Sequence, residues 1–201
     1  MQFIKEINNI YRLKVPFDTL YTSVFLIKDN SDFILIDCAT TKSDVDQIIV
    51  PALRSLSITL NDLKCVLVTH IHSDHSGGLQ RIKELCPSIN VITNLTQLTE
   101  NLEIYNLSGH TNGCIGVLDI ESGTLISGDG LQGYGVDKYR CSVESVQEYL
   151  NTIDRIKNDN RIQNVLFSHA YEPWYKDGAF GREQVEKCLK DCSDYIENNL
   201  K

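Results

Sequence analysis

The residue types that most plainly suggest chemistry stand together in one short segment, residues 69–78, which reads Thr-His-Ile-His-Ser-Asp-His-Ser-Gly-Gly. This segment contains three of the five histidines in the chain. His70 and His72 lie two residues apart at the end of a predicted strand, so both side chains can point to the same side. Asp74 and His75 follow at a turn and can face a second point nearby. Because imidazole and carboxylate groups suit Zn²⁺, and Fe or Mn less exclusively, the segment predicts ligands for two neighbouring metal ions.

Three further polar residues each follow an apolar strand. His110 lies in a Gly-His-Thr turn, Asp129 in a Gly-Asp-Gly turn, and His169 directly after the run Val-Leu-Phe-Ser. Taken singly, each is also consistent with a hydrogen-bonded histidine or an ordinary turn residue. In α/β sheets, however, binding sites assemble at the carboxyl ends of the strands. We therefore expect these three side chains to join the histidine segment.

The elements that would position these residues are short apolar strands and amphipathic helices. An apolar strand over 65–68 leads into the histidine segment, and a helix that begins near residue 76 follows it. Pro51 lies inside a predicted helix and is expected to kink or split it. The predicted strands are 10–15, 21–28, 33–36, 65–68, 91–93, 103–107, 115–120, 124–127 and 165–167, and the other predicted helices are 43–56, 142–157 and 181–200. This order indicates a layered α/β protein.

The composition is that of a globular protein of 201 residues, 42% hydrophobic and 23% charged. The length predicts one domain over residues 1–201. No apolar run is long enough to span a bilayer and no signal peptide is visible, so we expect no membrane association. The formal net charge of −8 disfavours a nucleic-acid partner. Seven scattered cysteines, an odd number, suggest reduced thiols, and together these features predict a cytoplasmic protein.

The order of the motifs resembles that of the metallo-β-lactamase superfamily. That family is read from a His-x-His-x-Asp-His loop, a Gly-His-Thr-x-Gly turn, a Gly-Asp turn and a late strand-end His. The chain carries these at residues 70–75, 109–113, 128–129 and 169, and Leu35-Ile36-Asp37 is similar to the family's early strand-end Asp. Ala39, Asn112 and Cys114 depart from residues frequent in the family, and none of them is a ligand. The resemblance implies an α/β fold, an αββα sandwich of two mixed sheets flanked by helices, with a two-metal cleft.

The resemblance also implies a role for each residue. His70, His72 and His110 would hold the first metal, Asp74, His75 and His169 the second, and Asp129 would bridge both. Asp37 would hydrogen-bond a ligand and fix its orientation, the alternative being a helix-capping or turn residue. Asp74 would be the catalytic residue that accepts or relays a proton. The expected cofactor is a pair of Zn²⁺ ions, with Fe or Mn as the other possibilities.

The reaction that the resemblance implies is hydrolysis of a small ester, thioester or lactone by a metal-bridging hydroxide, as in glyoxalase II. The expected partner is therefore a small-molecule substrate. Two loops, after Asp129 and after His169, carry aromatic and basic side chains that suit a planar or anionic ligand. These candidate pocket residues are Tyr134, Tyr139, Arg140, Tyr171 and Trp174. An ordinary solvated loop is an equally simple interpretation.

Two other functions remain open from the sequence. A persulfide dioxygenase-like enzyme would use a single iron held by three histidines. A non-catalytic metal-binding module would keep the ligands and leave substrates intact. Structural zinc sites usually rely on thiolates, whereas the candidate ligands here are nitrogen and oxygen atoms, which favours an open catalytic site. The sequence makes no prediction of the oligomeric state.

Overall fold

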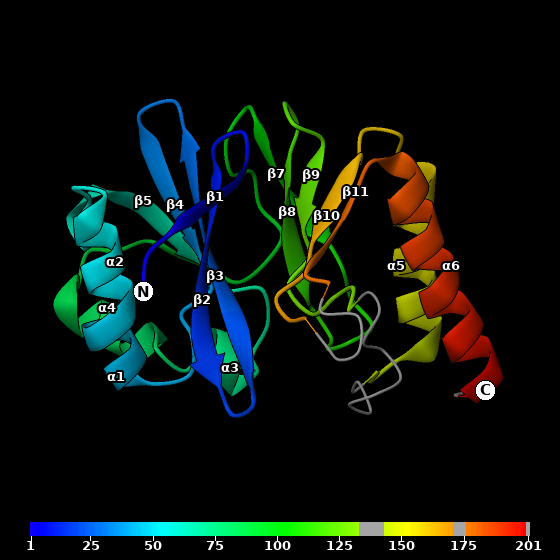
Figure 1. Ribbon diagram of the computed structural model, residues 1–201, viewed down its shortest axis with the longest axis horizontal. Coiled ribbons are helices and arrows are strands. Elements are labelled where there is room, and N and C mark those ends of the chain that lie inside the picture. Colours follow the sequence, from blue (N-terminus) through cyan, green and yellow to red (C-terminus); the bar gives the residue numbers. More distant parts are fainter. Residues whose placement is uncertain (133–142, 171–175, 200–201) are drawn as a thin grey trace. The chain divides into compact units, whose positions relative to one another are not determined.

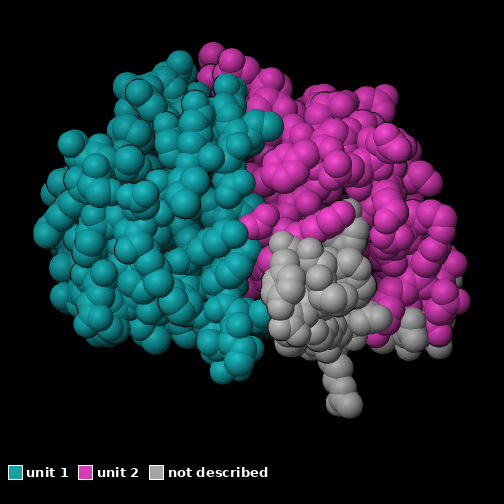
Figure 2. All heavy atoms as spheres, viewed as in Figure 1, with its two compact units in different colours: residues 1–93 teal, residues 94–201 magenta. Residues whose placement is uncertain are grey.

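The computed structural model describes residues 1–132, 143–170 and 176–199. It contains two compact units, Met1–Thr93 and Asn94–Lys201, which Figure 2 colours separately. Each unit is built on one mixed β-sheet with helices of its own (Figure 1). The predicted class of two mixed sheets with flanking helices is therefore confirmed, whereas a single domain over residues 1–201 stays a prediction.

The first unit has a six-stranded sheet in the order β1-β2-β3-β4-β5-β6. Its first four strands pair antiparallel, and β5 and β6 continue the sheet in parallel with β4. Asn8, Asp18 and Asn30 lie with positive φ in the turns that join the first four strands, a conformation that Asn and Asp tolerate better than most residues. The strands are β1 (Ile4–Ile7), β2 (Ile10–Phe17), β3 (Leu20–Asp29), β4 (Asp32–Ile36), β5 (Leu63–Leu67) and β6 (Val91–Ile92).

The helix predicted over 43–56 consists of α1 (Lys42–Asp44), a π-helical turn (Val45–Ile49) and α2 (Val50–Ser55). Its first turn is capped by Thr41, whose hydroxyl accepts from the Asp44 main chain at 3.1 Å. Pro51 lies in the first turn of α2, directly after the π-helical turn. Because proline offers no N–H to the preceding turn, the expected break appears as a change in helical winding.

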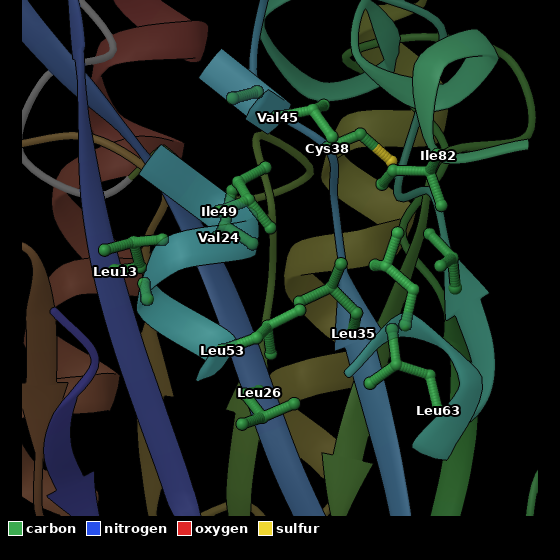
Figure 3. Close-up of a cluster of buried hydrophobic side chains, with 14 of the residues drawn as sticks. Leu13, Val24, Leu26, Leu35, Cys38, Val45, Ile49, Leu53, Leu63 and Ile82 are labelled. Atoms are coloured by element: carbon green, nitrogen blue, oxygen red, sulfur yellow. The ribbon is translucent and has the colours of Figure 1, made fainter. Parts of the chain in front are cut away.

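The core of the first unit lies between its sheet and these helices (Figure 3). Alternate residues of β2, β3 and β4 point toward the helices, as the two-residue period of a strand requires. The buried side chains include Leu13, Val24, Leu26, Leu35, Val45, Ile49, Leu53 and Ile82, the last from α4 (Leu79–Leu85). Burying each such side chain contributes about 1.5–3 kcal/mol. This core holds the ends of β4 and β5, which lead into Asp37 and the histidine segment.

The second unit has a five-stranded sheet in the order β11-β10-β9-β8-β7. β9 and β10 pair in parallel, and the other neighbours pair antiparallel. The strands are β7 (Leu102–Asn106), β8 (Ile115–Asp119), β9 (Thr124–Ile126), β10 (Asn164–Leu166) and β11 (Gly178–Phe180). The sequence does not predict β11, because Gly-Ala-Phe contains no β-branched residue and does not read as an apolar strand.

Two long helices complete the second unit, α5 (Val146–Asn158) and α6 (Arg182–Asn199), and they lie side by side (Figure 1). They correspond to the helices predicted over 142–157 and 181–200. Their apolar faces pack on β8, β9 and β10, in a core that includes Leu118, Leu125, Tyr149, Ile153, Val165 and Leu189. Among the described residues, neither these helices nor the shorter ones have the length and apolar character to cross a membrane.

Candidate metal centre

The histidine segment begins where β5 ends. Because β5 lies between two parallel neighbours, β4 and β6, the sheet determines where the following residues emerge. His72 precedes a single helical turn, α3 (Ser73–Ser76), which carries Asp74 and His75. His70, Asp74 and His75 are buried and His72 is partly buried. We call His70, His72, Asp74 and His75 the first half-site.

Ring nitrogens and a carboxylate oxygen of the first half-site lie close together in pairs. Nε2 of His70 is 3.0 Å from Nδ1 of His72. Nε2 of His75 is 3.2 Å from a carboxylate oxygen of Asp74. The ring centroids of His70 and His75 are 4.2 Å apart. The structure therefore brings these four side chains together within the first unit, and their expected roles as ligands of two neighbouring metals stay a prediction.

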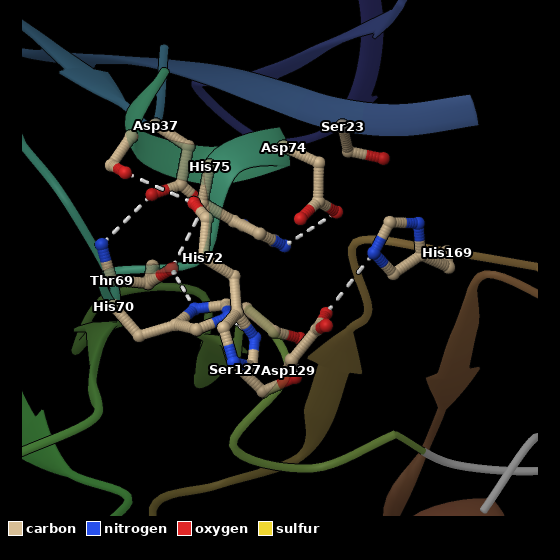
Figure 4. A network of polar contacts seen from close by, with 12 residues as sticks. Ser23, Asp37, Thr69, His70, His72, Asp74, His75, Ser127, Asp129 and His169 are labelled. Atoms are coloured by element: carbon tan, nitrogen blue, oxygen red, sulfur yellow. Dashed lines mark hydrogen bonds and ion pairs between the residues drawn. The ribbon is translucent and has the colours of Figure 1, made fainter. Parts of the chain in front are cut away.

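Asp37 lies beside Thr69 and His75 and is 1% exposed (Figure 4). One carboxylate oxygen accepts from the main-chain N–H of Thr69 at 2.8 Å. The other accepts from the Thr69 hydroxyl at 2.9 Å and from Nδ1 of His75 at 2.7 Å. Since a carboxylate only accepts hydrogen bonds, Nδ1 of His75 donates to Asp37, and Nε2 is the ring nitrogen that faces Asp74.

Two glycines after the histidines are required by close packing against the loop that follows β4. A Cβ on Gly77 would lie 1.9 Å from the carbonyl oxygen of Thr40, and one on Gly78 would lie 2.1 Å from that of Cys38. The main chain of Cys38 donates to the His75 carbonyl at 2.7 Å. The loop that carries Asp37 and the turn that carries His75 are thus bound directly together.

In the second unit, His110, Asp129 and His169 are buried and close to one another. One oxygen of Asp129 is 3.3 Å from Nε2 of His169, and the other is 3.8 Å from Nε2 of His110. Each oxygen of this carboxylate therefore faces a different imidazole. We call these three residues the second half-site, and they are the three residues that the sequence places after strands β7, β9 and β10.

Gln132 joins the second half-site without any signal in the sequence. Its side-chain nitrogen is 3.2 Å from Nδ1 of His110, and its side chain is buried. The turn before His110 requires Gly109, which has a φ of 137° and whose Cβ would lie 2.5 Å from the main chain of Tyr149 in α5. Close contact of Gly109 with α5 therefore fixes the main-chain position from which the His110 side chain extends.

The donor set of each half-site suits a divalent cation. Ligand atoms on a tetrahedral zinc ion with bonds of about 2.0–2.1 Å lie about 3.3–3.4 Å apart. The pairs His70–His72, Asp74–His75 and Asp129–His169 have ligand atoms 3.0, 3.2 and 3.3 Å apart. All these atoms are nitrogen or oxygen. Burial, and secondarily the charge of Asp37, raise the pKa of the Cys38 thiol well above its usual value, so this neighbouring cysteine stays a neutral thiol.

The five residues expected to form the substrate pocket, Tyr134, Tyr139, Arg140, Tyr171 and Trp174, lie outside the described residues. Their predicted contact with a substrate stays a prediction.

Known proteins share both the sequence pattern and the fold. A family model described as the metallo-beta-lactamase superfamily matches residues 17–93, which include Asp37 and the first half-site. A metallo-β-lactamase from Erythrobacter litoralis has a TM-score of 0.71 at 18% identity, covering 96% of this chain and 95% of that one. One from Pontibacter korlensis has a TM-score of 0.72 at 15% identity, covering 98% and 99%. Over residues 17–93 the chain is therefore similar to the metallo-β-lactamase superfamily, and it shares the fold of these solved metallo-β-lactamases.

Several relatives of this chain are named hydroxyacylglutathione hydrolase. The one from Vibrio campbellii is 28% identical over 149 residues, 61% of this chain and 58% of the relative. The one from Pseudomonas fluorescens is 30% identical over 149 residues, 62% and 56%. A Drosophila melanogaster relative named beta-lactamase-like protein 2 homolog is 28% identical over 178 residues, 74% and 58%. The chain spans less than two thirds of the length of these three relatives.

Proposed function

We propose that this protein is a metal-dependent hydrolase of the metallo-β-lactamase superfamily whose two half-sites act together on two divalent cations. His70, His72 and His110 hold one cation, Asp74, His75 and His169 hold the other, and Asp129 is shared. The observation that carries the proposal is the position of Asp129, whose two oxygens face two different imidazoles, as a bridging carboxylate requires. The order of the motifs along the chain supports joining the two half-sites.

When bound, a pair of Zn²⁺ ions supplies a water whose pKa falls to about 7 and a Lewis acid for a substrate carbonyl. The protein contributes the orientation of the ligands. Asp37 keeps the proton of His75 on Nδ1, so that Nε2 is available. Asp74 is 8% exposed, so its carboxylate combines burial with some access to solvent, and we assign it the acceptance or relay of a proton.

The proposed substrate is a small molecule with an ester, thioester or lactone bond. The relatives named hydroxyacylglutathione hydrolase favour a thioester. Zn²⁺ as the resident metal, the cytoplasm as the location, and a pocket wall formed by Tyr134, Tyr139, Arg140, Tyr171 and Trp174 belong to the same proposal.

Metal analysis combined with a substrate panel tests the proposal. Protein exposed to excess Zn²⁺ and then desalted is analysed for metal per chain, and is assayed with a hydroxyacylglutathione thioester, an aryl ester, a lactone and a phosphodiester. His72→Ala and Asp129→Asn are compared with Asp32→Asn, a control that alters only the exposed ion pair with Lys64. We expect about two metals per wild-type chain, and a loss of more than about 100-fold in activity, together with bound metal, in the first two variants.

Other results would point elsewhere. Full activity of metal-free His72→Ala would contradict the proposal. One iron per chain with consumption of oxygen would indicate the persulfide dioxygenase-like alternative. Two bound metals with all four substrates left intact would indicate a metal-binding module without catalysis.

A further inference from the structure

The hydroxyl of Thr69 connects Asp37 to His70 within the first unit (Figure 4). Thr69 follows β5 and is fully buried. Its Oγ1 lies 2.9 Å from a carboxylate oxygen of Asp37 and 3.1 Å from Nδ1 of His70. The same carboxylate oxygen accepts from His75 at 2.7 Å. Two histidines therefore meet one carboxylate, His75 directly and His70 through a hydroxyl group.

The direction of these hydrogen bonds follows from what each group can donate. A hydroxyl has one proton to give and can also accept. Since the Asp37 carboxylate only accepts, Thr69 donates its proton to Asp37. The contact with His70 must then run the other way, with Nδ1 of His70 donating to Oγ1 of Thr69. This places the lone pair of His70 on Nε2, the atom 3.0 Å from Nδ1 of His72.

We propose that Thr69 is a positioning residue that transmits the orienting effect of Asp37 to His70. One buried carboxylate then sets the ring tautomer of two histidines, each of which presents Nε2 as the ligand atom. The consequence for metal binding rests on the proposed function, in which His70 and His75 serve different cations. Loss of the Thr69 hydroxyl should therefore weaken one metal position and spare the other.

The hydroxyl of Thr69 can be removed without losing the main-chain contact between Thr69 and Asp37. Its N–H donates to the other oxygen of Asp37 at 2.8 Å, a contact that any side chain at this position retains. Thr69→Val keeps the branched shape and the main-chain bond and removes only the hydroxyl. Thr69→Ser keeps the hydroxyl and is the matched control.

The first measurement needs no metal. In metal-free protein, long-range ¹H–¹⁵N spectra report which ring nitrogen is protonated, with signals assigned through a His70→Gln variant. We expect His70 to carry its proton on Nδ1 in the wild type and in Thr69→Ser. In Thr69→Val, the Nε2-protonated form should increase for His70, while His75 keeps its Nδ1 proton. An unchanged His70 tautomer in Thr69→Val would overturn the inference.

The second measurement is a Zn²⁺ titration in competition with a chelator. We expect one of the two binding steps to weaken about 10–100-fold in Thr69→Val and to recover in Thr69→Ser. Equal weakening of both steps would overturn the assignment of Thr69 to a single position. A tautomer change in a protein that binds no Zn²⁺ would support the relay and contradict the proposed function instead, so the two failures are distinguishable.

Discussion

Asp37→Asn keeps the size of a buried side chain and removes its charge. The carboxylate accepts from the Thr69 main chain at 2.8 Å, the Thr69 hydroxyl at 2.9 Å and His75 Nδ1 at 2.7 Å. An asparagine can keep the first bond through its carbonyl oxygen. Its amide nitrogen is a donor and would then face the two remaining donors, so neither Thr69 nor His75 can donate a hydrogen bond to it.

The magnitude follows from the number and type of the lost bonds. Hydrogen bonds to charged groups contribute about 1.5–3 kcal/mol each, which gives about 3–6 kcal/mol for two. Part of this loss is offset because a buried charge no longer needs to be desolvated. The positive φ of 65° at this residue adds no strain, since asparagine tolerates it as well as aspartate does. We expect the free energy of unfolding to fall by about 2–4 kcal/mol.

Urea unfolding of the metal-free protein at neutral pH, followed by circular dichroism, measures this change. Asp32→Asn is the matched control, because it removes the same charge from the exposed start of β4. Asp32 is 2.6 Å from Lys64, with both side chains about two-fifths exposed, so its loss should be less than about 1 kcal/mol. If Asp37→Asn is no more destabilising than Asp32→Asn, Asp37 does not organise the histidine segment.

Three further outcomes are expected. Gly78→Ala should lower the free energy of unfolding by more than about 2 kcal/mol, because the new Cβ would lie 2.1 Å from the Cys38 carbonyl oxygen. In the control Gly113→Ala the Cβ would meet nothing within 4 Å, so only the φ of 75° is strained and the loss should be about 1–2 kcal/mol. Equal losses in urea unfolding would refute this. Removal of metal with a chelator should lower the Tm by about 5–10 °C and added Zn²⁺ should restore it, and an unchanged calorimetric scan would contradict the metal centre. Burial, and then the charge of Asp159, raise the pKa of Tyr105 to about 12. The stability that its neutral phenol contributes is therefore complete below about pH 10 and is lost as the pH rises toward about 12. In urea unfolding, Tyr105→Phe should lose less stability with rising pH than the wild type, and equal losses in the two proteins would exclude the shift.

Part of the candidate site is a local property of the chain and could be predicted without a structure. The spacing of His70, His72, Asp74 and His75 already places four candidate ligands within one strand end and one turn. The apolar run before them predicts a buried strand, and β5 is that strand. The amphipathic pattern likewise predicts α5 and α6, because a helix face that must be buried shows in the sequence.

Other parts depend on residues that are distant in the chain. Thr69 and Asp37 are 32 residues apart, and Gln132 and His110 are 22 residues apart, so neither pair has a spacing that a motif could show. Gly78 looks like an ordinary loop glycine in the sequence, and only the carbonyl of Cys38 explains it. β11 has no strand-like pattern of its own, and it forms where β10 offers it hydrogen bonds.

By itself the sequence determined which chemical groups the chain offers, the order in which they follow its strands, and the family to which that order is similar. Tertiary structure alone decided that Asp129 lies between His110 and His169, and that Asp37 contacts His75 directly and the Thr69 hydroxyl beside His70. The physical reason is that hydrogen bonds and ligand geometry depend on distances of a few ångströms through space. Packing of sheets and helices sets those distances, and spacing along the chain does not.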